Sequence, residues 1–119
     1  MKTLKLVLTF LFGALMILAG LNHFLKAKMY FPFIPDFLPK EIINYLAGLM
    51  EIVLGIGVFI PPLRDKATLG ILILMCMFLP LHVWDIMKEH PAIGSHAMAL
   101  VRLPVQFLFI GWAWFISRK

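Results

Sequence analysis

Residues 45–57, with the sequence YLAGLMEIVLGIG, form an apolar run that contains a single carboxylate, Glu51. At helical spacing Gly48, Glu51 and Gly55 fall at i, i+3 and i+7, so they lie on one face. Small residues on such a face let a neighbouring helix or a ligand approach the backbone closely. An ionisable side chain inside a membrane span is a candidate for a functional site. The stretch therefore predicts a membrane helix with a buried carboxylate that the other segments must accommodate.

The composition is typical of an integral membrane protein. Of the 119 residues, 62% are hydrophobic and 14% are charged, and the mean hydropathy is +0.96. No polar stretch is long enough to cover a soluble core, which predicts one small membrane domain over residues 1–119, in contact with the lipid bilayer. The net charge of +5 comes from basic residues at the ends of apolar runs, where they anchor helices, so we expect no nucleic-acid partner.

Side chains suited to thiol or metal chemistry are sparse. The single cysteine, Cys76, lies inside an apolar run, so neither a disulfide framework nor a CxxC couple exists within the chain. The four histidines are not clustered with cysteines, and we expect no metal site. Dithiol chemistry would need a partner protein.

Apolar runs separated by prolines and polar turns predict four helices, at about residues 4–25, 41–60, 67–85 and 97–116. Each is close to the roughly 20 residues that cross a ~30 Å hydrocarbon core. The first run resembles a secretory signal peptide, but it lacks small residues at the spacing that cleavage requires. The predicted fold is all-α, a bundle of four antiparallel transmembrane helices running up-down-up-down.

Residues 26–40 are apolar and aromatic, yet Pro32, Pro35 and Pro39 rule out a regular helix through them. A connection this apolar is expected at the headgroup boundary, where aromatic rings are enriched. It is interpreted either as an interfacial belt or as a lid over a cavity, and the two are compatible. The candidate lid side chains are Tyr30, Phe31, Phe33 and Phe37.

Basic residues also bear on the orientation in the membrane. With four helices both termini lie on one side, and six lysines and arginines fall on that side against four on the other. The first group is Lys2, Lys5, Arg64, Lys66, Arg118 and Lys119; the second is Lys26, Lys28, Lys40 and Lys88. This bias favours cytoplasmic termini in a multi-pass protein of the cell (inner) membrane.

Polar side chains of all four predicted helices share one depth in the membrane. At ~1.5 Å per residue, they fall between the middle of the bilayer and the side opposite the termini. These side chains are Asn22, His23, Glu51, His82, Asp85, Arg102 and Gln106. We predict one buried network around a Glu51–Arg102 ion pair, extended by the two histidines and Gln106.

Two interpretations of this network remain open. The network can be structural. Apolar helices gain no hydrophobic driving force for association in lipid, so polar contacts would hold the four helices together. The polar groups nevertheless exceed what one ion pair requires, and this surplus favours a site that binds a ligand or handles protons.

Several short motifs, in this order and spacing, resemble the DoxX-like family of small four-helix membrane proteins. They are Gly20-Leu21-Asn22-His23-Phe24, Pro35-x-x-Leu38-Pro39, Gly48-x-x-Glu51-x-x-x-Gly55-x-Gly57, Pro61-x-x-Arg64, Arg102-Leu103-Pro104-x-Gln106 and Trp112-x-Trp114. The resemblance implies that His23, Glu51, Arg102 and Gln106 match the family's recurrent polar positions. That family looks related to membrane subunits of thiosulfate:quinone oxidoreductases, methylamine-utilisation maturation proteins and NACHO-type receptor assembly factors, so it implies no single function.

Three functions are therefore expected as alternatives. In the leading one, the polar pocket binds a small hydrophobic or amphipathic molecule such as a lipid or a quinone, which would be its cofactor. In the second, the protein is the membrane subunit of a quinone-linked oxidoreductase and needs a redox partner. In the third, it is an assembly factor or chaperone for other membrane proteins. Whether it is an enzyme, and whether it forms a homo-oligomer, stays open.

Overall fold

The computed structural model describes residues 2–87 and 96–118, and over these residues the protein is all-helical, as predicted. The long helices are α1 (Lys2–Leu25), α3 (Lys40–Gly57), α4 (Arg64–Met87) and α5 (His96–Ser117). They correspond to the four helices expected from the sequence. The shorter elements are α2 (Ala27–Tyr30) and the 3-10 turns η1 (Phe31–Phe33) and η2 (Pro61–Leu63). Lys88 and Lys119, which enter the charge bias, lie outside the described residues.

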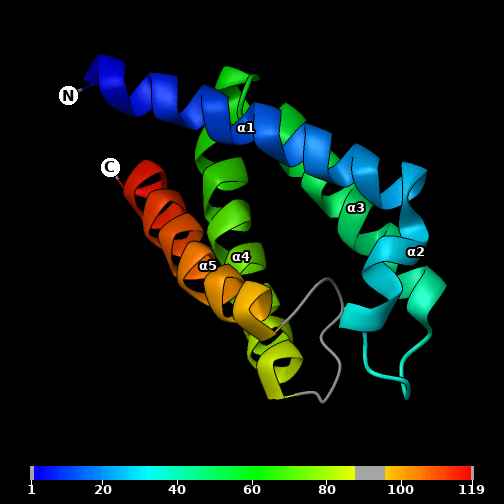
Figure 1. The fold of residues 1–119 in the computed structure, drawn as a ribbon. Coiled ribbons are helices and arrows are strands. Elements are labelled where there is room, and N and C mark those ends of the chain that lie inside the picture. Colours follow the sequence, from blue (N-terminus) through cyan, green and yellow to red (C-terminus); the bar gives the residue numbers. More distant parts are fainter. Residues whose placement is uncertain (1, 88–95, 119) are drawn as a thin grey trace.

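The long helices form two pairs (Figure 1). α1 packs along α3, and α4 packs along α5, while α3 also contacts α4 and α1 contacts α5. Figure 1 shows the two pairs set at an angle to each other, with the start of α1 and the end of α5 at the same end of the molecule. The contact between the pairs holds the main apolar cluster, which includes Phe12, Met16, Val58, Ile71 and Ala113.

Glycines set the distance between α1 and α3. A Cβ added at Gly20 would lie 2.6 Å from the carbonyl oxygen of Gly48, and one added at Gly55 would lie 2.7 Å from the carbonyl oxygen of Gly13. No side chain fits at these points because the neighbouring backbone fills the space. The glycine face predicted around Glu51 is thus the face on which α1 lies.

The outward faces of the helices are apolar. Leu18, Met77 and Leu108 are all more than half exposed, which is unfavourable in water but ordinary in lipid. Among the described residues three segments are long and apolar enough to cross a membrane: Lys2–Leu25, Pro61–Met87 and Leu100–Ser117. Helix α3 is not among them, and it carries Lys40, Glu41 and Glu51 within its 18 residues.

The aromatic segment between α1 and α3 consists of short turns rather than one helix. The single turn α2 is followed by η1, which contains Pro32, and irregular backbone then leads to Pro39, the residue that caps the start of α3. Pro32 lies in the first turn of η1 and Pro39 directly precedes α3, positions at which the missing N–H of proline breaks no helical hydrogen bond. The segment folds back against α1, α3 and α4.

Candidate functional site

A cavity of about 380 Å³ lies between the helix pairs, and all four long helices contribute to its wall. Most of the wall is apolar: Phe12, Leu15, Met16, Ala19, Ile34, Ile43, Ala47, Met75, Phe78, Leu81 and Phe109. The polar and aromatic remainder is His23, Tyr30, Phe33, Asn44, Glu51, His82, Arg102 and Gln106. A mostly apolar cavity of this size with a few convergent polar groups is typical of a small-molecule site.

The structure brings together five of the predicted site residues at this cavity: His23, Glu51, His82, Arg102 and Gln106. Asn22, the sixth, is not part of the wall. Its amide donates a hydrogen bond to the hydroxyl of Tyr30. The polar groups of the four helices therefore do share one location, but they are paired differently from the prediction.

The predicted ion pair between Glu51 and Arg102 is wrong. Glu51 Oε1 lies 2.9 Å from His23 Nε2, and both side chains are buried. The cause is the glycine contact between α1 and α3, since a Cβ at Gly48 would lie only 2.7 Å from the Cβ of His23. The helix that lies against the Glu51 face is thus α1, and His23 is the polar residue that it presents.

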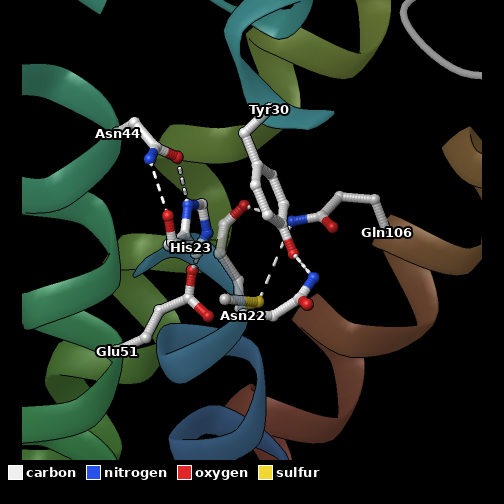
Figure 2. Close-up of polar contacts among 7 residues, drawn as sticks. Asn22, His23, Tyr30, Asn44, Glu51 and Gln106 are labelled. Atoms are coloured by element: carbon white, nitrogen blue, oxygen red, sulfur yellow. Dashed lines mark hydrogen bonds and ion pairs between the residues drawn. The ribbon is translucent and has the colours of Figure 1, made fainter. Parts of the chain in front are cut away.

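Asn44, which the sequence analysis missed, determines the protonation of His23 (Figure 2). Asn44 Nδ2 donates to the backbone carbonyl of His23 at 2.9 Å, so the amide orientation is set and Oδ1 faces His23 Nδ1 at 2.6 Å. Nδ1 must then carry a proton and donate it. Nε2 and Glu51 Oε1 share the second proton, either as imidazolium and carboxylate or as imidazole and carboxylic acid. Both arrangements leave the pair neutral overall.

A signal for Asn44 was present in the sequence. It lies four residues before Gly48 and seven before Glu51, on the same buried face of α3. A polar residue on a glycine-lined face that also carries an acid is a candidate partner for the group that the acid contacts.

Replacing Asn44 by leucine is expected to destabilise the protein. The change keeps the side-chain volume but leaves the Nδ1–H and the carbonyl of His23 buried without partners, at about 1–3 kcal/mol for each group. Thermal unfolding in lipid nanodiscs measures the loss. Asn22→Leu removes a hydrogen bond from a less buried amide and serves as the control, with a smaller expected loss. Equal melting temperatures for wild type and Asn44→Leu would contradict the role assigned to Asn44.

The second ion pair joins α4 to α5. Arg102 Nη2 donates to Asp85 Oδ2 at 2.8 Å, and the Asp85 side chain is only 1% exposed. Asp85 was predicted to lie at the same depth as Arg102, but not to be its counter-charge. Because α5 packs along α4, the acid on α4 lies within reach of Arg102, whereas Glu51 is already held by His23.

Two further polar side chains face the cavity from α4 and α5. Gln106 Nε2 donates to the backbone carbonyl of Met75 at 2.7 Å, which sets the orientation of its amide. His82 Nδ1 is buried and has no hydrogen-bond partner among the described residues. Within the described segments, His82 is thus the polar side chain of the wall that no protein hydrogen bond occupies.

The candidate lid residues separate into two groups. Tyr30 stacks on His23 with ring centroids 3.8 Å apart, and Phe33 contacts both His82 and Arg102. Phe31 is half-buried outside the cavity wall, and Phe37 is 84% exposed. The segment α2–η1 thus covers the cavity through Tyr30 and Phe33, one ring against each ion pair. No cluster of three or more metal-ligating side chains occurs in the part of the chain that the structure describes.

Comparison with protein families identifies the chain directly. The family described as "Domain of unknown function (DUF8561)" matches residues 12–117. The chain belongs to this family. The match includes every residue of the cavity wall. Comparisons with curated proteins and with solved structures give no significant match, so the DoxX-like resemblance stays a prediction.

Proposed function

We propose that this DUF8561 protein is a multi-pass membrane protein whose cavity binds a small amphipathic molecule, such as a quinone or a lipid. One observation carries the proposal: side chains from both helix pairs place polar groups in the wall of an otherwise apolar cavity. His82 Nδ1 supports it further, because it is buried without a partner among the residues that the structure describes. Such a nitrogen is costly unless another molecule occupies it.

In this proposal all four long helices cross the membrane as an antiparallel bundle with cytoplasmic termini. Helix α3 reaches about 27 Å at 1.5 Å per residue, nearly enough to span the hydrocarbon core. Two of its charged residues, Lys40 and Glu41, lie at its N-terminal end. The third, Glu51, is neutralised by His23. Its packing along α1, itself long and apolar enough to cross, supports a shared orientation.

A bound molecule would place its apolar body against the rings and aliphatic chains of the wall. Its head group would meet the polar side chains His82 and Gln106, which lie on the α4–α5 side. Since the His23–Glu51 pair and the Arg102–Asp85 pair are each neutral overall, neither presents an uncompensated charge to the head group. Apolar burial then supplies most of the affinity, and the polar contacts select the ligand.

Filling the cavity tests the proposal without disturbing either ion pair. Ala47→Phe adds a ring to the cavity wall, and we expect it to abolish the retention of quinones or lipids. Leu46→Phe changes the adjacent residue of α3, which is 53% exposed, and should retain them. Native mass spectrometry of the purified protein, followed by thermal-shift measurements with added quinones and lipids, gives the readout. If wild type retains no molecule, or Ala47→Phe retains it unchanged, the proposed function is wrong.

The shared proton between His23 and Glu51 favours a second candidate function. A neutral pair that holds one proton between two atoms 2.9 Å apart can accept or release a proton during quinone chemistry. The protein would then be the membrane subunit of a quinone-linked oxidoreductase. This predicts an inert purified subunit, activity only with a redox partner, and loss of that activity in Glu51→Gln.

A further inference from the structure

Three side chains of the cavity wall keep an atom that can accept a hydrogen bond from a ligand. The wall also holds a buried donor, Arg102 Nε. Gln106 Nε2 is committed to Met75, so its Oε1 is the atom available to a ligand. Glu51 Oε1 is committed to His23, and its second oxygen points away from that contact (Figure 2). Neither of these two oxygens has a hydrogen-bond partner in the described part of the chain.

His82 adds a third acceptor. Its Nδ1 is buried without a partner in the segments described, and it accepts a hydrogen bond when the ring proton is on Nε2. The ring is placed by the edge-to-face contact with Phe33, whose centroid is 5.8 Å away. The free nitrogen is therefore on a positioned ring of the cavity wall.

The charges of the wall point to an uncharged ligand. Glu51 is neutralised by His23 at 2.9 Å, and Arg102 by Asp85 at 2.8 Å. A charged head group would enter an apolar cavity with no uncompensated opposite charge to meet it, which is costly in a medium of low dielectric constant.

We infer that the cavity selects neutral molecules whose head group donates hydrogen bonds, that is, phenols, quinols or aliphatic alcohols with an apolar body. The inference rests on the proposed function and narrows its ligands to those with a hydroxyl, so that a quinol is favoured over the corresponding quinone. A hydroxyl donates to one of the free acceptors and keeps its own lone pairs for a second contact. A carbonyl or ether can accept from Arg102 Nε but leaves all three acceptors unpaired, and a carboxylate adds a charge.

A pair of probes that differ by one methyl group tests this selection. 4-Octylphenol and 4-octylanisole share ring and chain, but the methyl ether has no donor. We expect wild-type protein in nanodiscs to bind the phenol roughly tenfold more tightly than the anisole, because the anisole leaves a buried acceptor unpaired. 4-Octylbenzoate at pH 8 should bind more weakly than the phenol.

Variants show whether the cavity causes the selection. Comparing the phenol-to-anisole affinity ratio between variants cancels the difference in how the two probes partition into lipid. His82→Phe removes the free nitrogen while keeping an aromatic ring beside Phe33, and breaks no hydrogen bond of the described structure. It should reduce the phenol-to-anisole ratio several-fold. Trp112→Phe removes the hydrogen bond to the Leu8 carbonyl, outside the cavity wall, and should leave the ratio unchanged.

The outcomes separate the inference from the proposed function. Equal affinity for phenol and anisole, or benzoate binding as tight as phenol binding, overturns the inference but not the proposed function. If His82→Phe leaves the phenol-to-anisole affinity ratio unchanged, His82 does not contribute to the selection, which also contradicts the inference. Absence of binding by all three probes overturns the inference, and the retention test with quinones and lipids then decides the proposed function independently.

Discussion

Gly20→Ala is expected to cost the protein several kcal/mol of stability, although alanine is the better helix former. The new Cβ would lie 2.6 Å from the Gly48 carbonyl oxygen and 2.6 Å from an Ile52 side-chain carbon. A backbone carbonyl cannot move aside as a side-chain end can, so the two helices must separate. Overpacking usually costs about 1–3 kcal/mol, and here the separation also stretches the contact of His23 with Glu51.

A matched control exists on α5. A Cβ added at Gly111 meets nothing within 4 Å, so Gly111→Ala gains helix propensity, about 0.5–1 kcal/mol, without a clash. Thermal unfolding of the two variants in nanodiscs isolates the close approach, because the chemical change is identical. A Gly20→Ala protein as stable as Gly111→Ala would show that α1 and α3 do not pack backbone to backbone.

Asp85→Ala is expected to cause a loss of about 3–5 kcal/mol, the cost of removing one partner from a buried ion pair. The Asp85 side chain is 1% exposed and that of Arg102 is 20% exposed, so the guanidinium would keep its charge with little access to water. The Lys40–Asp36 pair provides the comparison, since the Asp36 side chain is 97% exposed. Asp36→Ala should change the stability by less than about 1 kcal/mol.

A double variant distinguishes an unbalanced charge from lost packing. Asp85→Ala combined with Arg102→Met removes both charges and keeps an apolar chain on α5. It should be more stable than Asp85→Ala alone, because the buried charge is gone. A double variant less stable than Asp85→Ala, measured by thermal unfolding, would show that Arg102 stabilises the protein independently of Asp85.

The helices were predictable because their signals are local. The prolines at 32, 35 and 39 mark the break between α1 and α3, and apolar runs extend to positions close to the observed helix ends. The spacing of Gly48, Glu51 and Gly55 correctly indicated a face of close approach. The common depth of the polar residues likewise predicted that several helices contribute to one cavity.

The pairing of the charges was not predictable in the same way. Helical spacing and depth place a side chain along its own axis, but they do not say which helix lies opposite. Arg102 was assigned to Glu51 because both share a depth, whereas α5 packs along α4 and presents Arg102 to Asp85. Two side chains at the same depth in the membrane make contact only if their helices are also neighbours and face each other.

The sequence by itself determined that the chain is helical and apolar, that Glu51 lies on a glycine face, and that polar groups gather at one level. Only the tertiary structure decided that Glu51 contacts His23 and that Asn44 sets the proton on that histidine. It also decided that His82 Nδ1, in the cavity wall, has no hydrogen-bond partner in residues 2–87 and 96–118. The physical reason is that helical periodicity depends on residues close together in the sequence. Hydrogen-bond partners come from distant parts of the chain and depend on how closely the glycines let two helices approach.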